Sequence, residues 1–183
     1  SALYNTMYPL IRLITTSVNG FLSEPIDFDG VCETTFCCRP WDVDMFLEVN
    51  NGRLLTLYDL GRFDFSVRVG LARILKQNGW GLVVAGSSAR YRRRVRMFDK
   101  VTIHTRVAGF DQRWIYVMQS MWVRGMPTSS VLLRTGITHE GKVIPVDDVL
   151  DAMNIENWKP EPAGWVRDWI HSEDNREWPP LLQ

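Results

Sequence analysis

Two carboxylates separated by one residue, Asp42 and Asp44, lie shortly before a pair of asparagines, Asn50 and Asn51. Asparagine is a favoured N-cap residue, so a helix is expected to begin at this pair. Apolar residues then recur at helical spacing: Leu54, Leu55, Leu57 and Tyr58. The spacing places a carboxylate just ahead of a buried helix, which is typical of an active-site loop. The alternative is that both aspartates are ordinary turn residues and the asparagines only cap the helix.

A second candidate site is the run 89–98, which holds five arginines. Alternate side chains of a strand share a face, so a strand here would carry one cationic stripe. The stripe would consist of Arg90, Arg92, Arg94 and Arg96. Guanidinium groups match the geometry of phosphates, which would suit the nucleotide part of a phosphate-bearing substrate. The alternatives are a solvated outer face or a sheet edge protected by charge.

Other reactive residue types occur without the partners that their chemistry needs. His104, His139 and His171 have no partner at metal-ligand spacing, so no metal site and no cofactor are predicted. The Ser87-Ser88 pair lacks a nucleophile-elbow motif. Three cysteines without a C-x-x-C pair argue against a disulfide scaffold or a zinc site, and they predict a reducing, cytoplasmic location.

The composition of the 183 residues predicts one globular domain. Lys and Arg together number 21, as do Asp and Glu, so the net charge of zero gives no general attraction to nucleic acid. The apolar run 7–18 contains Arg12 and is shorter than the roughly 20 residues of a transmembrane helix, so no membrane-spanning segment is predicted.

The pattern of apolar residues gives the order of the elements. Helices are expected over residues 3–14 and 52–78, the second in two pieces with the first over 52–61, and a short one over 146–153. A first strand is expected over 34–41. Four further strands with hairpin turns between them follow: 82–98, 101–108, 114–123 and 131–139.

This order predicts an α+β fold in which a curved antiparallel sheet wraps around one central helix. The single domain would cover residues 1–183, with its core over about 34–140. An extension, 1–30, would precede the core. A tail, 155–183, would dock through its tryptophans Trp158, Trp165, Trp169 and Trp178.

The motif D-x-D-x-x-x-E-V-N-N, followed by a long helix and four strands, resembles the hotdog-fold acyl-CoA thioesterases of the 4-hydroxybenzoyl-CoA thioesterase type. The stretches Asn51-Gly52-Arg53-Leu54-Leu55 and Asp59-Leu60-Gly61-Arg62 are similar to the thioesterase superfamily member six branch. The resemblance covers about residues 34–140. It implies a hotdog fold, an acyl-CoA substrate and a homodimer or dimer of dimers with the site between subunits.

The resemblance also implies roles for individual residues. Asp44 matches the general base or nucleophile of the family, and amides at the helix start would donate hydrogen bonds to the oxyanion. Asp42 is expected to matter less. The candidate catalytic residues are Asp44, Glu48, Asn51 and Asp59. The candidate substrate-binding residues are Asn50, Gly52, Arg53, Arg90, Arg92 and Arg94.

Two departures from the family pattern leave other functions open. Glu48 stands where histidine is usual, and Leu54 where tyrosine is common, so a non-catalytic acyl-binding protein is an alternative. Glu48 would add like-charge repulsion near Asp44. A hotdog hydratase or dehydratase is a further alternative, although no histidine lies between Trp41 and Gly81. Asp59 could be a second acidic group or could pair with Arg62 three residues on.

Overall fold

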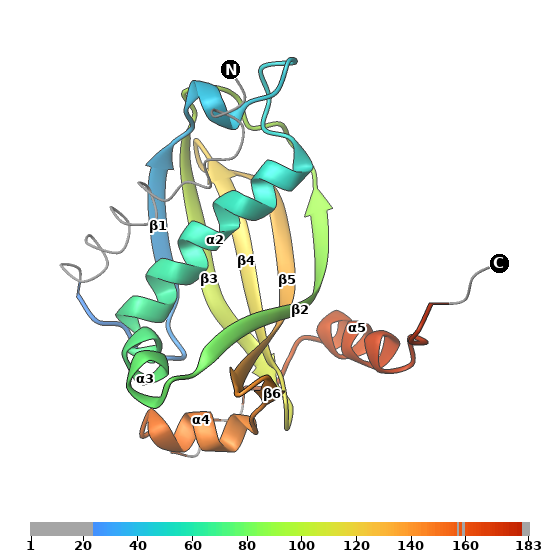
Figure 1. Ribbon diagram of the computed structural model, residues 1–183. Helices are drawn as coiled ribbons and strands as arrows, with labels where there is room; N and C mark the ends of the chain where they lie inside the picture. The colour runs from blue at the N-terminus through green and yellow to red at the C-terminus, as the bar shows by residue number, and fades with distance from the viewer. Residues whose placement is uncertain (1–23, 157, 159, 181–183) are drawn as a thin grey trace.

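One long helix, α2 (Asn51–Arg68), lies across the concave face of a curved antiparallel sheet in the computed structural model (Figure 1). The structure describes residues 24–156, 158 and 160–180, so the helix expected over 3–14 lies outside the described residues. The predicted α+β layout, a sheet wrapped around a central helix, is confirmed.

The sheet has the strand order β1-β3-β4-β5-β2, with the short β6 paired to β5. Neighbouring strands are antiparallel throughout. Their bounds are β1 (Cys32–Cys37), β2 (Gly81–Tyr91), β3 (Lys100–Phe110), β4 (Ile115–Val123), β5 (Met126–His139) and β6 (Lys142–Val143). The strand that follows the helices in sequence, β2, therefore forms one edge of the sheet.

The first strand ends earlier than the sequence predicts. Residues Pro40–Asp42 form a short 3-10 helix, η1, in which the Asp42 amide donates to the Arg39 carbonyl at 2.9 Å. Proline has no amide to give to a strand ladder and fits the first position of a helix. The prediction of a strand to Trp41 was wrong, and Asp42 sits in a tight turn.

The predicted strand over 82–98 was also too long. The Arg92 and Arg93 amides both donate to the carbonyl of Thr128, at 2.8 and 2.9 Å, so the regular alternation of the strand stops there. Arg92 and Arg94 lie beyond β2 (Gly81–Tyr91), and the predicted four-arginine stripe of a continuous strand does not form. In contrast, β5 (Met126–His139) begins five residues before its predicted start.

The helical region divides at a glycine. Gly70, with φ of 82°, separates α2 from α3 (Leu71–Asn78), so the first piece runs seven residues past its predicted end at Gly61. A positive φ is easily adopted by glycine and breaks the helix. The predicted apolar stripe is buried against the sheet, with Leu54, Leu57 and Tyr58 each at most 4% exposed.

The middle of α2 touches the sheet closely at Gly61. A β-carbon built on this glycine would lie 2.7 Å from Ile103 Cγ2 and 2.9 Å from both Gln119 Nε2 and Thr105 Oγ1. No real side chain tolerates such distances, so the absence of one lets the helix rest directly on β3 and β4.

Two shorter helices follow the sheet, α4 (Val146–Ala152) within the predicted 146–153 and α5 (Gly164–Asp174). Val166 and the partly buried Trp169 of α5 pack with Ala108, Tyr116 and Leu132 in a second apolar cluster, separate from the main core. Sheet residues adjacent in sequence to these three belong to the main core, so α5 covers the convex face. None of the described helices is long and apolar enough to cross a bilayer.

Candidate functional site

The loop ahead of α2 is anchored by Asp42, whose side chain is fully buried. Its Oδ1 accepts hydrogen bonds from Arg53 Nη2 at 2.7 Å and Nε at 3.1 Å, and its Oδ2 accepts from the Arg39 amide at 2.8 Å. Both carboxylate oxygens are therefore occupied within the protein. Asp42 ties the loop to the first turn of the helix, which the sequence did not predict.

Asp44 is partly exposed and lies in a compact turn two residues further on. Its Oδ1 accepts from the Phe46 amide at 2.8 Å, and its own amide donates to the Glu48 carbonyl at 2.9 Å. Leu47 completes the turn with a φ of 61°. This backbone arrangement fixes the carboxylate of Asp44 ahead of α2, where the motif places it.

The helix start is built as predicted around Asn50. Asn50 is the N-cap, and its Oδ1 accepts from the Arg53 amide at 2.9 Å. The Arg53 amide therefore donates to the N-cap side chain, and the Arg53 guanidinium donates to Asp42. Neither group is directed to a substrate oxyanion. The backbone amides of Asn51 and Gly52 lie in the first turn, where helix amides have no carbonyl acceptor within the helix. They remain the candidate donors to an oxyanion.

The arginine-rich segment after β2 faces this loop. Glu48 accepts from Arg94 Nη1 at 2.8 Å and forms an isolated antiparallel bridge with Arg96. The Glu48 carboxylate, which was expected to repel Asp44, forms an ion pair with Arg94. Arg90 and Arg92 are exposed.

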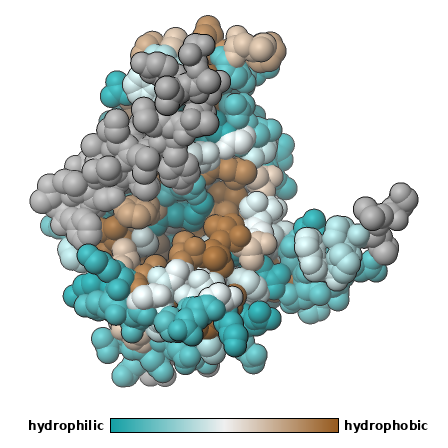
Figure 2. Space-filling view, in the orientation of Figure 1, coloured by the Kyte–Doolittle hydropathy of each residue, from teal (hydrophilic) through white to brown (hydrophobic). Residues whose placement is uncertain are grey.

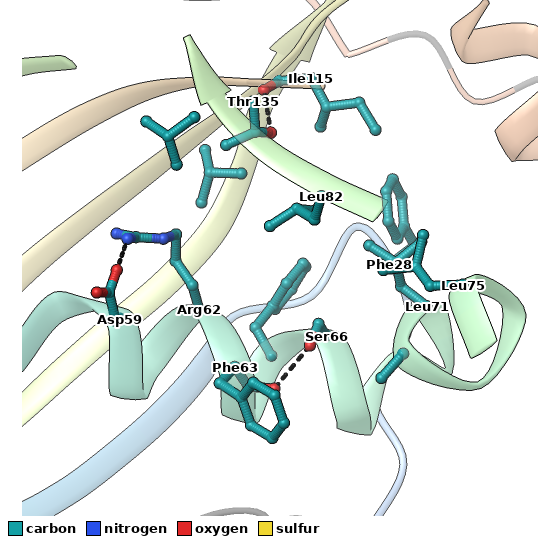
Figure 3. Close-up of a pocket in the computed structure, with 14 residues that line it drawn as sticks. Phe28, Asp59, Arg62, Phe63, Ser66, Leu71, Leu75, Leu82, Ile115 and Thr135 are labelled. Atoms are coloured by element: carbon teal, nitrogen blue, oxygen red, sulfur yellow. Dashed lines mark hydrogen bonds and ion pairs between the residues drawn. The ribbon is translucent and has the colours of Figure 1, made fainter. Parts of the chain in front are cut away.

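A cavity of about 460 Å³ lies between the second half of α2, α3 and the first half of β2 (Figure 3). Its walls are mostly aliphatic and aromatic. The lining residues are Phe28, Phe63, Phe65, Leu71, Ala72, Leu75, Leu82, Val84, Ile115 and Val117, with Asp59, Arg62, Ser66 and Thr135 as the polar members. A volume in this range suits a small organic ligand.

The charged end of the cavity is formed by Asp59 and Arg62. Their predicted pairing across one helix face is confirmed, as the two side chains form an ion pair (Figure 3). Arg62 Nη1 also donates to Gln119 Oε1 at 2.9 Å. The guanidinium is thereby held from both the helix and the sheet.

Gln119 is fully buried on β4, and sequence reasoning missed it. Its Nε2 donates to the Tyr58 carbonyl at 3.0 Å and to Thr105 Oγ1 at 2.9 Å. A carbonyl can only accept, so the amide nitrogen must face the helix and the amide oxygen must face Arg62. The signal was a polar residue at an inward position of an alternating strand, between Val117 and Met121.

The two parts of the candidate site lie at opposite ends of β2. The cavity is lined by Leu82 and Val84 near its start, whereas the Asp44 loop meets the chain beyond its end, where the Val49 amide donates to the Val95 carbonyl at 2.9 Å. Asp44 does not line the cavity. A single chain therefore does not bring Asp44 and Asp59 together in this cavity.

The edge strand β2 carries apolar side chains that are unusually exposed. Leu82, Val83 and Val84 are 44%, 38% and 46% exposed. Figure 2 shows hydrophobic residues gathered in the middle of the view, where β2 runs in Figure 1. Exposed apolar edges of this kind are typical of surfaces that another chain covers.

Comparison with known proteins places this architecture in a family. The model of the thioesterase-like superfamily matches residues 38–152. The chain is similar to Protein THEM6 of Xenopus laevis, with 36% identity over 80 residues, which are 44% of this chain and 39% of that one. The match thus spans well under half of that relative, and it confirms the resemblance to the member six branch.

Solved structures confirm the hotdog fold. YbaW, a probable thioesterase from Escherichia coli, superposes with a TM-score of 0.62 at 17% identity, over 67% of this chain and 96% of that one. A Thermus thermophilus thioesterase complexed with coenzyme A and zinc gives 0.58 at 19% identity, over 66% and 95%. The match to the family model covers most of the sheet and both helices of the concave face, and the chain belongs to the thioesterase-like superfamily.

Proposed function

We propose that the protein hydrolyses an acyl-CoA thioester to a free acid and coenzyme A. The observation that carries the proposal is the largely apolar cavity of about 460 Å³ against α2, because an acyl chain needs such a pocket. The superfamily to which the chain belongs supports the reaction class.

The chemistry follows from the turn at Asp44. Its carboxylate either takes a proton from water that attacks the thioester carbonyl or attacks that carbon itself, giving an anhydride that water then opens. In both cases the C–S bond breaks and the sulfur leaves as a thiolate that takes up a proton. The first-turn amides of Asn51 and Gly52 stabilise the oxyanion.

The role of Asp59 differs from that of Asp44. Its carboxylate is held by Arg62 in an ion pair, and Arg62 is held by Gln119. Because Arg62 already engages this carboxylate, we assign Asp59 and Arg62 to the polar end of the acyl pocket. They would orient an acyl group rather than react with it.

The nucleotide end of coenzyme A would lie on exposed arginines. Arg90 and Arg92 are free to reach solvent, while Arg94 is engaged with Glu48. The phosphates of coenzyme A match guanidinium geometry, and the Thermus relative is a complex with coenzyme A. We therefore place these phosphates at Arg90 and Arg92.

A homodimer would assemble these parts into one site. Edge-to-edge antiparallel pairing of β2 with its copy would join the backbone groups at this edge and bring the exposed Leu82, Val83 and Val84 close to the interface. Leu82 and Tyr91 are nine residues apart, which is about 30 Å of strand. Antiparallel pairing sets the start of one β2 beside the end of the other, so the pocket of one protomer would meet the partner's Asp44.

Subunit complementation tests the whole proposal. An Asp44→Asn variant lacks the reacting carboxylate, and an Ala72→Trp variant has a filled pocket. Each alone should be nearly inactive, whereas mixed dimers should recover up to about half of the wild-type activity per hybrid, since one of the two composite sites is intact. Thiol release from dodecanoyl-CoA is the measurement, and no recovery on mixing would contradict a shared site.

A non-catalytic acyl-binding protein is the second candidate. It is favoured by Glu48, which replaces the usual histidine and is neutralised by Arg94. The two functions separate in one experiment: such a protein would bind dodecanoyl-CoA in equilibrium dialysis and release no thiol. The cytoplasmic location stays a prediction from the cysteine content.

A further inference from the structure

Helix α5 crosses the convex face toward the sheet edge that the proposed dimer would use. Pro162, just before the helix, lies over β3, because a β-carbon on Gly109 would be 3.1 Å from it. Trp169 then stacks edge-on against Tyr116 of β4, with ring centroids 6.2 Å apart. The helix thus runs across the strands and not along them.

The last turn of α5 reaches β5 and β2. Asp174 accepts from Arg134 Nη2 of β5 at 2.9 Å. A β-carbon on Gly86 of β2 would lie 3.6 Å from Glu173 Oε2 and 3.8 Å from Trp169 Cη2. Because β2 is the end of the strand order, the chain after Asp174 leaves the sheet at this edge (Figure 1).

The segment 175–180 beyond the helix has no cover of its own. All six residues are exposed, and Trp178 is 89% exposed, the highest value among the exposed large hydrophobic residues of the described chain. Extended, six residues span about 20 Å, which is about four strand spacings of roughly 4.8 Å. The segment is therefore long enough to cross from one sheet edge onto an adjoining sheet.

We propose that residues 175–180 form a strap that lies on the convex face of a second copy of this chain, with Trp178 as its apolar anchor. The inference rests on the homodimer of the proposed function. Val83 points to the convex side, since its neighbours Leu82 and Val84 line the cavity on the concave side. The partner's Val83, which is 38% exposed in the single chain, is an apolar surface within reach.

The strap lies outside the stretch that the superfamily model matches, since that match ends at residue 152 and α5 begins at Gly164. By symmetry each protomer would hold the other, so the two straps would clamp the paired β2 edges from the convex side. The concave side, with the cavity and Asp44, would stay untouched. The strap would therefore govern assembly and leave the chemistry of an assembled dimer unchanged.

Two exposed tryptophans of the same tail give a matched test. In sedimentation equilibrium, Trp178→Ala should raise the dimer dissociation constant about tenfold or more. Trp165→Ala, at the start of α5 and far from the edge, should change it less than about twofold, although Trp165 is 51% exposed. Equal effects of the two substitutions would overturn the strap.

A cross-link locates the strap directly. The full chain with photoreactive p-benzoylphenylalanine at position 178 is prepared in normal and heavy-isotope forms, mixed and irradiated. Mixed-isotope peptides that join residue 178 to β2 or β5 are expected. Cross-links within one chain, or to other elements, would overturn the inference while thiol release by the same dimer still supports the proposed function. A wild-type chain that sediments only as a monomer would overturn both the strap and the shared site.

Discussion

Arg53 Nη2 lies 2.7 Å from Oδ1 of Asp42, and the Asp42 side chain in this pair has no exposed surface. The pair joins the turn that carries Asp44 to the first turn of α2. The position of the candidate catalytic carboxylate therefore depends on a residue two positions before it.

Asp42→Asn should destabilise the fold by about 3 kcal/mol, because it leaves the Arg53 guanidinium partly buried without its counter-ion. Urea unfolding gives the free energy. Glu48→Gln is the matched control, as it removes an ion pair whose Arg94 side chain is 71% exposed, and it should cost less than about 1 kcal/mol. Comparable losses in both variants would show that burial of the Asp42 pair does not matter.

Asp44→Asn should lower kcat for acyl-CoA hydrolysis by about 100-fold or more, because the amide cannot act as base or nucleophile. The amide oxygen can still accept from Phe46, so the turn should persist. Circular dichroism and thiol release check the two halves of this expectation. Near-full hydrolysis by the folded variant, free of contaminating thioesterase, would show that another carboxylate carries out the reaction.

Ala72→Phe should shorten the acyl pocket. Its side chain would project into the cavity, so KM for dodecanoyl-CoA should rise about tenfold or more, while acetyl-CoA kinetics stay within about twofold. Arg73→Phe places the same side chain on the exposed neighbour and serves as control. If KM rises equally for dodecanoyl-CoA and acetyl-CoA, the cavity does not hold the acyl chain.

Replacing Arg90 and Arg92 together with Ala should raise KM for acyl-CoA about tenfold and leave kcat nearly unchanged, since binding common to the ground and transition states is lost. The difference from wild type should shrink as salt screens the exposed charges. Arg106→Ala removes an exposed arginine of β3 and should leave KM unaltered. An unchanged KM in the double variant would show that both arginines belong to a solvated outer face and do not bind the substrate.

The free energy of unfolding should fall as pH rises from about 9 toward 11. Burial, followed by the nearby charge of Asp64, raises the pKa of Cys32 from 9.0 to about 11. Above pH 9 the unfolded chain thus binds fewer protons than the folded one, which favours unfolding. Burial raises the Tyr58 and Tyr116 pKa values in the same sense. Cys32→Ala should reduce the fall in the free energy of unfolding between pH 9 and 10, and Cys37→Ala should not.

The central helix and its buried stripe could be predicted because apolar periodicity reports directly on burial. The N-cap at Asn50 could be predicted because a short polar side chain before an apolar run has few other uses. The strand limits could not, since they depend on pairing with distant residues. One carbonyl, that of Thr128, accepts two successive amides and ends β2 seven residues before its predicted end at Phe98.

The positions of several candidate residues could be predicted, whereas the residues that they contact could not. Asp44, Asn50 and the Asp59–Arg62 pair lie where the motif and helix spacing put them. The hydrogen bond from Arg53 to Asp42 joins residues eleven positions apart. It depends on the 3-10 turn at Pro40, where a strand was predicted. The hydrogen bond from Arg62 to Gln119 joins residues 57 positions apart, so no local sequence pattern could predict it.

The absence of a side chain at Gly61 sets how closely the middle of α2 approaches the sheet. A β-carbon there would come within 3 Å of Ile103, Thr105 and Gln119, so any larger residue would force the helix away from the sheet at this point. Four of the five α2 residues that line the cavity follow Gly61, whereas the turn of Asp44 precedes the start of the helix at Asn51. Substitutions in α3 or late α2 can therefore change the shape of the cavity without displacing the turn that carries Asp44.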